Sequence, residues 1–362
     1  MSNVIEGVQS GLEGVVAFAT EIAEPDKEGG ALRYRGVDIE DLVGEVPYEK
    51  VWGLLVDGSF DPGLAPAEQH PLTIRCGDPR VDVQAAIAAL APEWGFQQLI
   101  DITDDQARQD LARASVMALS FVAQSARGLG KPWVPQEEID QGGTLAERFL
   151  IRWRGEAHPD HAKAIDAYWI SAAEHGMNAS TFTARVVAST GADVAAALSS
   201  AIGALSGPLH GGAPSRVLRM LDEVEQTGDA EKWVKDALDR GERLMGFGHR
   251  VYRAEDPRAR VLRRTAREIG STRFEVAEAL EQAALAELKA RRPDRVLATN
   301  VEFWSAVVLD TAQVPPELFT SMFTCARVAG WSAHILEQKR EARLIRPTAK
   351  YVGPAPRPVA EV

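Results

Sequence analysis

Three of the seven histidines stand where glycine, proline or small residues interrupt a helical pattern: His175, His210 and His249. His210 follows a Gly-Pro pair and precedes a helix that we expect to begin near Pro214. The macrodipole at a helix N-terminus disfavours the imidazolium form, so the ring stays neutral and can donate a hydrogen bond. The alternative is a turn histidine bonded to backbone, and His210 alone does not decide between the two.

His249 lies in a glycine-rich loop whose charged residues are mostly cationic. Gly246 and Gly248 allow the backbone to come close to a ligand. The arginines of the loop are Arg250, Arg253 and Arg258. Paired N–H donors of arginine hold carboxylates and phosphates. A solvated basic face is the alternative, but apolar residues interrupt the charges and an Asp-Pro turn precedes Arg258.

Three further residues are candidates for the same chemistry. Arg327 lies in an otherwise apolar helix over residues 319–336, where an inward guanidinium needs a partner. Arg346 precedes Pro347 near the C-terminus. Glu302 is flanked by apolar and aromatic residues, which would raise its pKa toward that of a general base. The alternative for Glu302 is a surface residue at a helix start.

Composition limits the class of protein. The chain has 362 residues, 45% of them hydrophobic, and a net charge of −12. This charge argues against a general affinity for nucleic acid or anionic membranes, so anionic ligands must be held by local arginines. Cys76 and Cys325 fit neither a disulfide framework nor a zinc site. We find no targeting segment or membrane span and expect a cytoplasmic protein.

The elements that must position these residues are mainly helices. Strand-like residues over 14–22 and 31–36 predict a small N-terminal hairpin around a polar turn. Apolar residues at spacings of three and four predict helices over residues 81–90, 106–125, 145–152, 162–174, 180–189 and 193–205. The last of these is rich in small residues, which suits a core or a subunit interface. Prolines after Arg340 predict an extended arm.

Taken together, these segments resemble the citrate synthase family over nearly the whole chain, from Gly11 to Pro354. The motifs stand in the family's order: residues 10–15 (SGLEGV) with 32–36 (LRYRG), 174–183 (EHGMNASTFT), 207–212 (GPLHGG), the loop from His249 to Arg258, 300–302 (NVE), and Arg346-Pro347. One such motif is weak evidence, but the ordered set is specific.

The resemblance implies a mainly α, two-domain helical fold with a small N-terminal β-hairpin. A large domain would comprise residues 1–211 and 312–362, and a small domain residues 212–311. The active site would lie between the two domains of a homodimer, where closure excludes water from the acyl-CoA intermediates. The chain length resembles that of the short dimeric bacterial enzymes.

The resemblance also implies roles for the candidate residues. Oxaloacetate would be bound by His175, His249, Arg258 and Arg327, with Arg346 donated across the dimer interface. His210 would donate a hydrogen bond to the acetyl-CoA carbonyl while Glu302 removes a methyl proton, and His249 would polarise the ketone. Arg253 and Arg250 would contact CoA. The citryl-CoA formed would be hydrolysed to citrate and CoA, with no metal and no cofactor.

This sequence departs from the family pattern at two places. Glu302 stands where the family's general base is ordinarily an aspartate, and Glu174 precedes His175 where an aspartate is commoner. A displaced carboxylate can cost about a hundredfold in rate. Residues 58–136 carry little family pattern. Two alternatives therefore stay open: a 2-methylcitrate synthase that uses propionyl-CoA, and a catalytically weak paralogue that binds CoA or a dicarboxylate.

Overall fold

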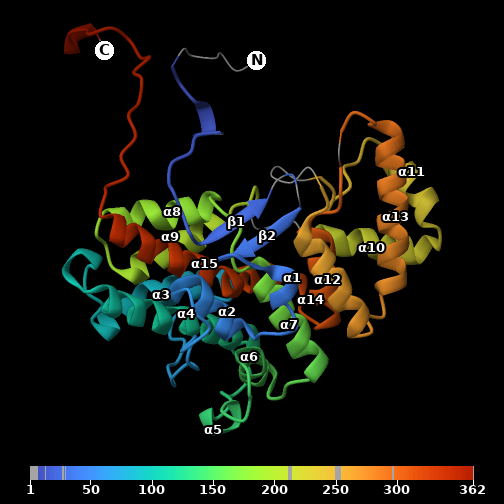
Figure 1. The fold of residues 1–362 in the computed structure, drawn as a ribbon, viewed down its shortest axis with the longest axis horizontal. Coiled ribbons are helices and arrows are strands. Elements are labelled where there is room, and N and C mark those ends of the chain that lie inside the picture. The colour runs from blue at the N-terminus through green and yellow to red at the C-terminus, as the bar shows by residue number, and fades with distance from the viewer. Residues whose placement is uncertain are drawn as a thin grey trace.

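The computed structural model describes residues 7–12, 14–26, 28, 30–210, 214–248, 254–295 and 297–361. Helices dominate this part of the chain, and a small antiparallel sheet lies near its N-terminus (Figure 1). The prediction of a mainly α fold with an N-terminal hairpin is confirmed. None of the helices in the described ranges is both long and apolar enough to cross a membrane.

The sheet consists of β1 (Ala23–Asp26), β2 (Ala31–Tyr34) and β3 (Val37–Asp38), paired antiparallel in that order. Its first strand was predicted over residues 14–22 but lies at residues 23–26, and the last two of these were assigned to the turn over residues 25–30. The reason is burial: Val16 is 90% exposed and has nothing to pack against, whereas Ile22 and Leu32 are buried. Residues 15–20 instead form part of an extended N-terminal arm.

The N-terminal helices follow the sheet and, with α15, make up the larger part of the molecule. They are α1 (Ile39–Leu42), α2 (Tyr48–Asp57), α3 (Pro79–Trp94), α4 (Asp104–Arg127), α5 (Gln136–Ile139), α6 (Leu145–Arg154), α7 (Pro159–Ala172), α8 (Ala179–Ser189) and α9 (Val194–Leu205). Short 3-10 helices cover Ser10–Leu12, Leu99–Asp101, Pro316–Leu318 and Val359–Glu361. The helices predicted over residues 81–205 are all present and extend by a few residues beyond several of the predicted bounds.

Side-chain caps explain where several of these helices begin. Thr103 and Thr144 each form a capping box with the residue three positions later, at the start of α4 and α6. Asn178 caps α8 and Asp193 caps α9 through the backbone N–H groups of Thr181 and Ala196. These caps satisfy backbone N–H groups that would otherwise lack a partner in the first turn of a helix.

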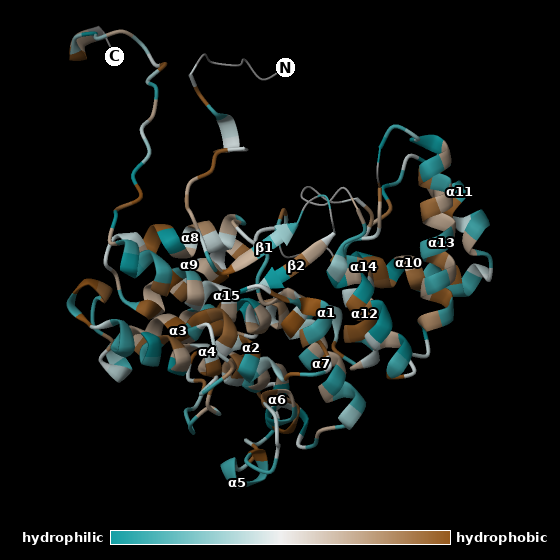
Figure 2. Ribbon diagram, in the orientation of Figure 1, coloured by the Kyte–Doolittle hydropathy of each residue, from teal (hydrophilic) through white to brown (hydrophobic). Residues whose placement is uncertain are grey.

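The helix α15 (Phe319–Glu341) forms the centre of this group and packs against α2, α4, α7, α8 and α9. It is buried on all sides, with Cys325, Val328, Trp331 and Ile335 each inaccessible to solvent. A helix that is buried all round needs no polar face. Figure 2 shows hydrophobic residues in the middle of the group and hydrophilic residues along its outline.

A second group follows in the chain: α10 (Pro214–Thr227), α11 (Ala230–Asp239), α12 (Pro257–Glu268), α13 (Phe274–Arg291) and α14 (Val301–Thr311). Within it α12 and α14 pack on α7, and α10, α11 and α13 lie to the side away from α15 (Figure 1). The predicted division at residues 212 and 311 stays a prediction.

The C-terminal arm, predicted from its prolines, starts after α15 and contains no helix until Val359. Both arms rise from the same side of the molecule (Figure 1). The arm exposes Tyr351, Val352 and Val359.

Candidate active site

The ring of His210 is fixed by the start of α8. Its Nε2 lies 2.9 Å from the hydroxyl of Ser180 and accepts a 3.4 Å hydrogen bond from the Ser180 backbone N–H. The backbone amide is only a donor, so Nε2 is the unprotonated nitrogen and Nδ1 carries the proton. The turn itself is closed by the His210 N–H, which donates to the carbonyl of Gly207. The N–H donor of His210 is therefore not occupied by Ser180, although it also interacts with the backbone of His210 itself.

His210 is neutral at physiological pH. Burial, together with the positive charge of Arg327, lowers its pKa to about 4. The neutral ring agrees with the sequence-based expectation, but the physical cause differs from the helix macrodipole invoked there. Residues 211–213, which separate His210 from α10, lie outside the described residues.

Phe323 connects His210 to Arg327. The His210 and Phe323 rings pack edge to face with centroids 6.1 Å apart, and the Arg327 guanidinium lies over the same Phe323 ring at 4.7 Å. The two residues of α15 are four positions apart and so share one face of the helix. Because its ring contacts both residues, the half-buried Phe323 places an apolar group between the imidazole and the guanidinium.

Arg327 is buried, with 1% of its surface exposed. Its Nε donates to the carbonyl of Ala172 at 2.8 Å, and its Nη1 has no hydrogen-bond partner among the described residues. Burial lowers the pKa of Arg327, although the nearby Glu174 carboxylate partly opposes this shift. A buried cation with an unused donor is suited to bind a carboxylate from a ligand.

Arg258 is held differently, by a carboxylate. Its Nε and Nη2 donate to the two oxygens of Asp256 at 2.9 and 2.7 Å. The second oxygen also accepts the backbone N–H of Val301 at 3.1 Å. Arg258 and Asp256 are both buried. Asp256 therefore joins the first turn of α12 to the start of α14, beside Glu302.

Glu302 lies in the first turn of α14, where its backbone N–H donates to the side chain of Asn300 at 3.0 Å. Burial raises the pKa of Glu302, and the positive charges of Arg258 and Arg243 offset part of this rise. The direction is the one predicted from the apolar residues around it. A carboxylate with a raised pKa is a stronger base, which suits proton abstraction.

The chain that leads to His249 is paired with the chain that leads to Glu302. Asn300 donates from its backbone to Gly246 at 2.9 Å and from its side chain to Gly248 at 2.8 Å. Gly246 has φ +87°, and a Cβ there would lie 2.8 Å from the Cβ of Phe303. Glycine is therefore required for this close approach. His249, Arg250 and Arg253 themselves lie outside the described residues.

The remaining two candidates lie at different places. His175 is half-buried and directly follows Glu174, at the end of the segment that contacts Arg327. Arg346 is exposed in the C-terminal arm, which leaves the end of α15 opposite to Phe323. Within one chain the structure brings His210 near Arg327 and Arg258 near Glu302, but it does not bring Arg346 to these residues.

Three contributing residues were not singled out from the sequence: Ser180, Asp256 and Phe323. Ser180 lies within a quoted motif, but its bond to His210 joins residues thirty positions apart. Asp256 was interpreted only as part of a turn, although an Asp before Pro and Arg is also the pattern of a helix N-cap. Phe323 could have been found from its spacing of four residues from Arg327.

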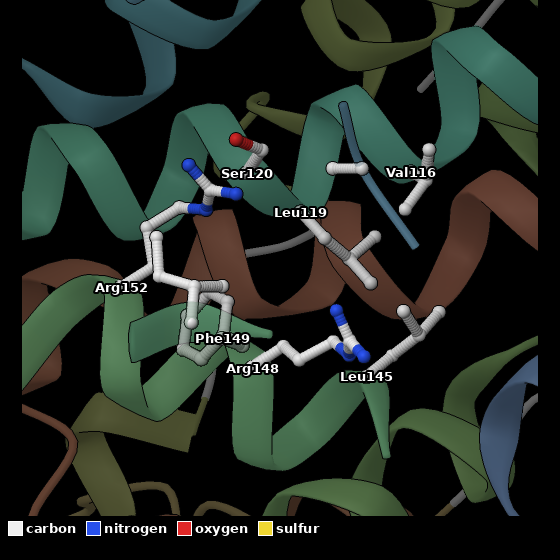
Figure 3. A pocket seen from close by; sticks show the side chains of 9 residues that line it. Val116, Leu119, Ser120, Leu145, Arg148, Phe149 and Arg152 are labelled. Carbon is white, nitrogen blue, oxygen red and sulfur yellow. The ribbon is translucent and has the colours of Figure 1, made fainter. Parts of the chain in front are cut away.

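Two other observations limit where ligands bind. No group of three or more His, Cys, Asp and Glu side chains in the described ranges is arranged to hold a metal ion. A pocket between α4 and α6 is lined by apolar residues with Arg148 and Arg152 at its sides (Figure 3). Its cavity volume is about 20 Å³, room for little more than one water molecule.

Known proteins are similar to this chain over nearly its whole length. Residues 11–348 match the family model described as "Citrate synthase, C-terminal domain". The Mycobacterium tuberculosis protein named "Putative citrate synthase 2" is 69% identical over 358 residues, which cover 99% of this chain and 96% of that protein. The citrate synthase of Haloferax volcanii is 36% identical, and the match covers 96% of each chain.

A solved structure is similar over its whole length. The citrate synthase of the archaeon Thermoplasma acidophilum, described as a ternary complex with carboxymethyl coenzyme A and oxaloacetate, matches with a TM-score of 0.80 and 29% identity. The match covers 99% of this chain and 100% of that one.

Proposed function

Because the chain belongs to the citrate synthase family, whose members are acyltransferases, we propose that it condenses acetyl-CoA with oxaloacetate to give citrate and CoA. The observation that carries the proposal is the neutral His210, with an N–H donor beside the Phe323–Arg327 pair. The Thermoplasma acidophilum enzyme, whose complex contains oxaloacetate and a CoA derivative, supports this choice of substrates.

The first step forms the enol of acetyl-CoA. Glu302 takes a proton from the methyl group while the Nδ1–H of His210 donates a hydrogen bond to the thioester carbonyl oxygen. Charge that develops on this oxygen is stabilised as it forms, without a charged acid in the site. The raised pKa of Glu302 and the neutral state of His210 match these two tasks.

Oxaloacetate is the electrophile in the second step. Arg327 and Arg258 bind its carboxylates with His175, and His249 polarises its ketone so that the enol carbon can attack. Arg346 completes the site from the second subunit of a homodimer, because the arm of one chain leads away from its own Arg327. Hydrolysis of citryl-CoA then releases citrate and CoA.

CoA is a substrate in this scheme, and the reaction needs neither a metal nor a redox cofactor. Arg253 and Arg250 contact the CoA phosphates. We place the enzyme in the cytoplasm, where both substrates would be available.

The test mixes the purified protein with acetyl-CoA and follows thiol release with and without oxaloacetate. We expect release that depends on oxaloacetate; none at high enzyme concentration would overturn the proposal. Parallel assays with propionyl-CoA compare kcat/KM for the two thioesters, and a higher value for propionyl-CoA would make the chain a 2-methylcitrate synthase. Tight oxaloacetate binding by calorimetry without turnover would indicate the binding paralogue, and Glu302→Asp should then restore turnover.

A further inference from the structure

Residues on successive turns of α15 bind the backbone just before His175. Arg327 donates to the carbonyl of Ala172 at 2.8 Å, and the backbone N–H of Gly330 donates to the carbonyl of Ala173 at 3.2 Å. Residues three apart lie on one face of a helix. One stripe of α15 therefore contacts the 172–174 segment, which ends immediately before His175.

The third contact of this stripe is between side chains. Nε2 of His334 lies 3.3 Å from a carboxylate oxygen of Glu174, and both side chains are almost completely buried. The other ring nitrogen of His334, Nδ1, is 3.0 Å from Nη1 of Arg185. A guanidinium is only a donor, so Nδ1 is the acceptor and Nε2 carries the proton that faces Glu174.

Glycine at position 330 makes this approach possible. A Cβ built there would lie 2.1 Å from a carboxylate oxygen of Glu174 and 2.6 Å from the carbonyl oxygen of Ala173. No side chain fits at those distances, so the Glu174 carboxylate lies directly against the backbone of α15. The position of this carboxylate is set by packing as well as by charge.

Arg185 fixes His334 from the other side. Its side chain is inaccessible to solvent, and it also donates to Gln338, Glu337 and Glu341, all on α15. The negative charges of these glutamates compensate the buried guanidinium. His334 is therefore held between a fixed arginine and Glu174, and it has little freedom to rotate.

We propose that Glu174 and His334 are positioning residues for His175: they fix the 172–174 segment on α15 and so aim the His175 ring at the dicarboxylate substrate. The proposal rests on the proposed function, in which His175 binds oxaloacetate. The Glu174 carboxylate is buried without a solvent contact, and Glu174 directly precedes His175 in the chain. Misplacement of a binding group by about 1 Å is enough to weaken a substrate contact strongly.

The experiment compares His334→Leu with His334→Gln in the full chain, and both with Glu341→Gln as the matched control. Leu removes both ring nitrogens, whereas Gln keeps an N–H donor near the position of Nε2. Glu341 also bonds Arg185, but it is partly exposed and does not contact the 172–174 segment. For His334→Leu we expect KM for oxaloacetate to rise about tenfold, with KM for acetyl-CoA within about twofold.

His334→Gln should restore the oxaloacetate KM to within about threefold of the wild type, and Glu341→Gln should leave it unchanged. A purely structural role would instead lower the unfolding midpoint and affect both substrates alike. An unchanged oxaloacetate KM in His334→Leu, a parallel rise for both substrates, or no rescue by Gln would each overturn the proposal.

Glu174→Gln gives a second measurement if His334→Leu fails to fold, and it should show the same selective rise. If neither variant folds, the pair is structural and the proposal is wrong. Absence of turnover in the wild type would contradict the proposed function alone. Positioning would then be measured from the NMR signals of the His175 ring, assigned with His175→Gln, which should shift in His334→Leu and stay unchanged in Glu341→Gln.

Discussion

The two halves of the site hold their arginines in opposite ways. In the half built on α15, Arg327 has a backbone carbonyl and an aromatic face as neighbours, and its Nη1 has no partner among the described residues. In the half built on α12 and α14, Arg258 already forms two bonds to the carboxylate of Asp256. The first arginine keeps its charge for a ligand, whereas the charge of the second also orders the protein.

The largest effect on kcat should come from removing a residue that acts in the enolisation step, in either half of the site. His210→Ala and Glu302→Gln are each expected to lower kcat by about a thousandfold, because both groups act on the same enolisation step. Circular dichroism should show an unchanged fold. Near-normal kcat in steady-state assays of either variant would remove that residue from the mechanism.

Substitutions of the two arginines should affect substrate binding and the stability of the fold to different extents. Arg327→Gln is expected to raise KM for oxaloacetate by about a hundredfold and to lower the free energy of unfolding by about 1 kcal/mol, because the buried bond to the Ala172 carbonyl is lost. Arg258→Gln should also lower the free energy of unfolding by about 3 kcal/mol, because Asp256 loses its buried partner. Substrate titrations and urea unfolding give both quantities, and equal unfolding curves for the two variants would contradict the comparison.

The half of the site built on α15 should also need Arg346 from a second chain for activity. Arg327→Ala and Arg346→Ala are each expected to be nearly inactive. If dimers re-form at random after mixing, half are heterodimers with one intact site of two, so about a quarter of wild-type activity should return. Mixed samples that stay inactive after exchange, measured against refolded wild type, would count against a shared site.

A smaller effect is expected where only the partner of Arg258 changes. Asp256→Asn should keep the hydrogen bond to Val301 but lose the negative charge, which raises KM for oxaloacetate by about tenfold and lowers the free energy of unfolding by about 2 kcal/mol. Asp229→Asn is the matched control, since Asp229 caps α11 through the N–H of Lys232. Equal destabilisation of both variants would mean that Asp256 acts only as a helix cap.

The smallest effect should be seen in the dependence of kcat on pH. Burial raises the pKa of Glu302, and the base works only when it is ionised, so kcat should fall as pH decreases through that pKa. The pKa of His210 is about 4, so its ring stays neutral over the same range. Profiles of kcat against pH should therefore show one acidic step, at a pH above the usual pKa range of a glutamate. A second step that His210→Gln removes would contradict the neutral assignment.

The sequence predicted most of the helices because their apolar residues recur at helical spacing, and α3 and α4 were found even though residues 58–136 carry little family pattern. It misplaced the first strand, because Val15 and Val16 have strand propensity but no buried surface to pack against. Local pattern does not report which segment has a partner in the fold.

The candidate site residues were found from titratable and cationic side chains within short motifs, such as His210, Arg258 and Glu302, and their roles stay predictions. The contacts that tune them were not found, because they join distant residues. The low pKa of His210 depends on burial and on Arg327, and its tautomer on Ser180. The stripe of α15 that contacts residues 172–174 likewise becomes visible only when two helices are placed together.

The glycine at position 330 carries a consequence for how this protein tolerates change. A side chain there would overlap both a carboxylate and a carbonyl oxygen, whereas at Gly207 the nearest atom to an added Cβ is 3.5 Å away. In a saturation library screened for folded protein, position 330 should retain glycine alone, and position 207 should accept alanine. Related sequences can therefore change at Gly207, which lies only a few residues from His210, but not at Gly330.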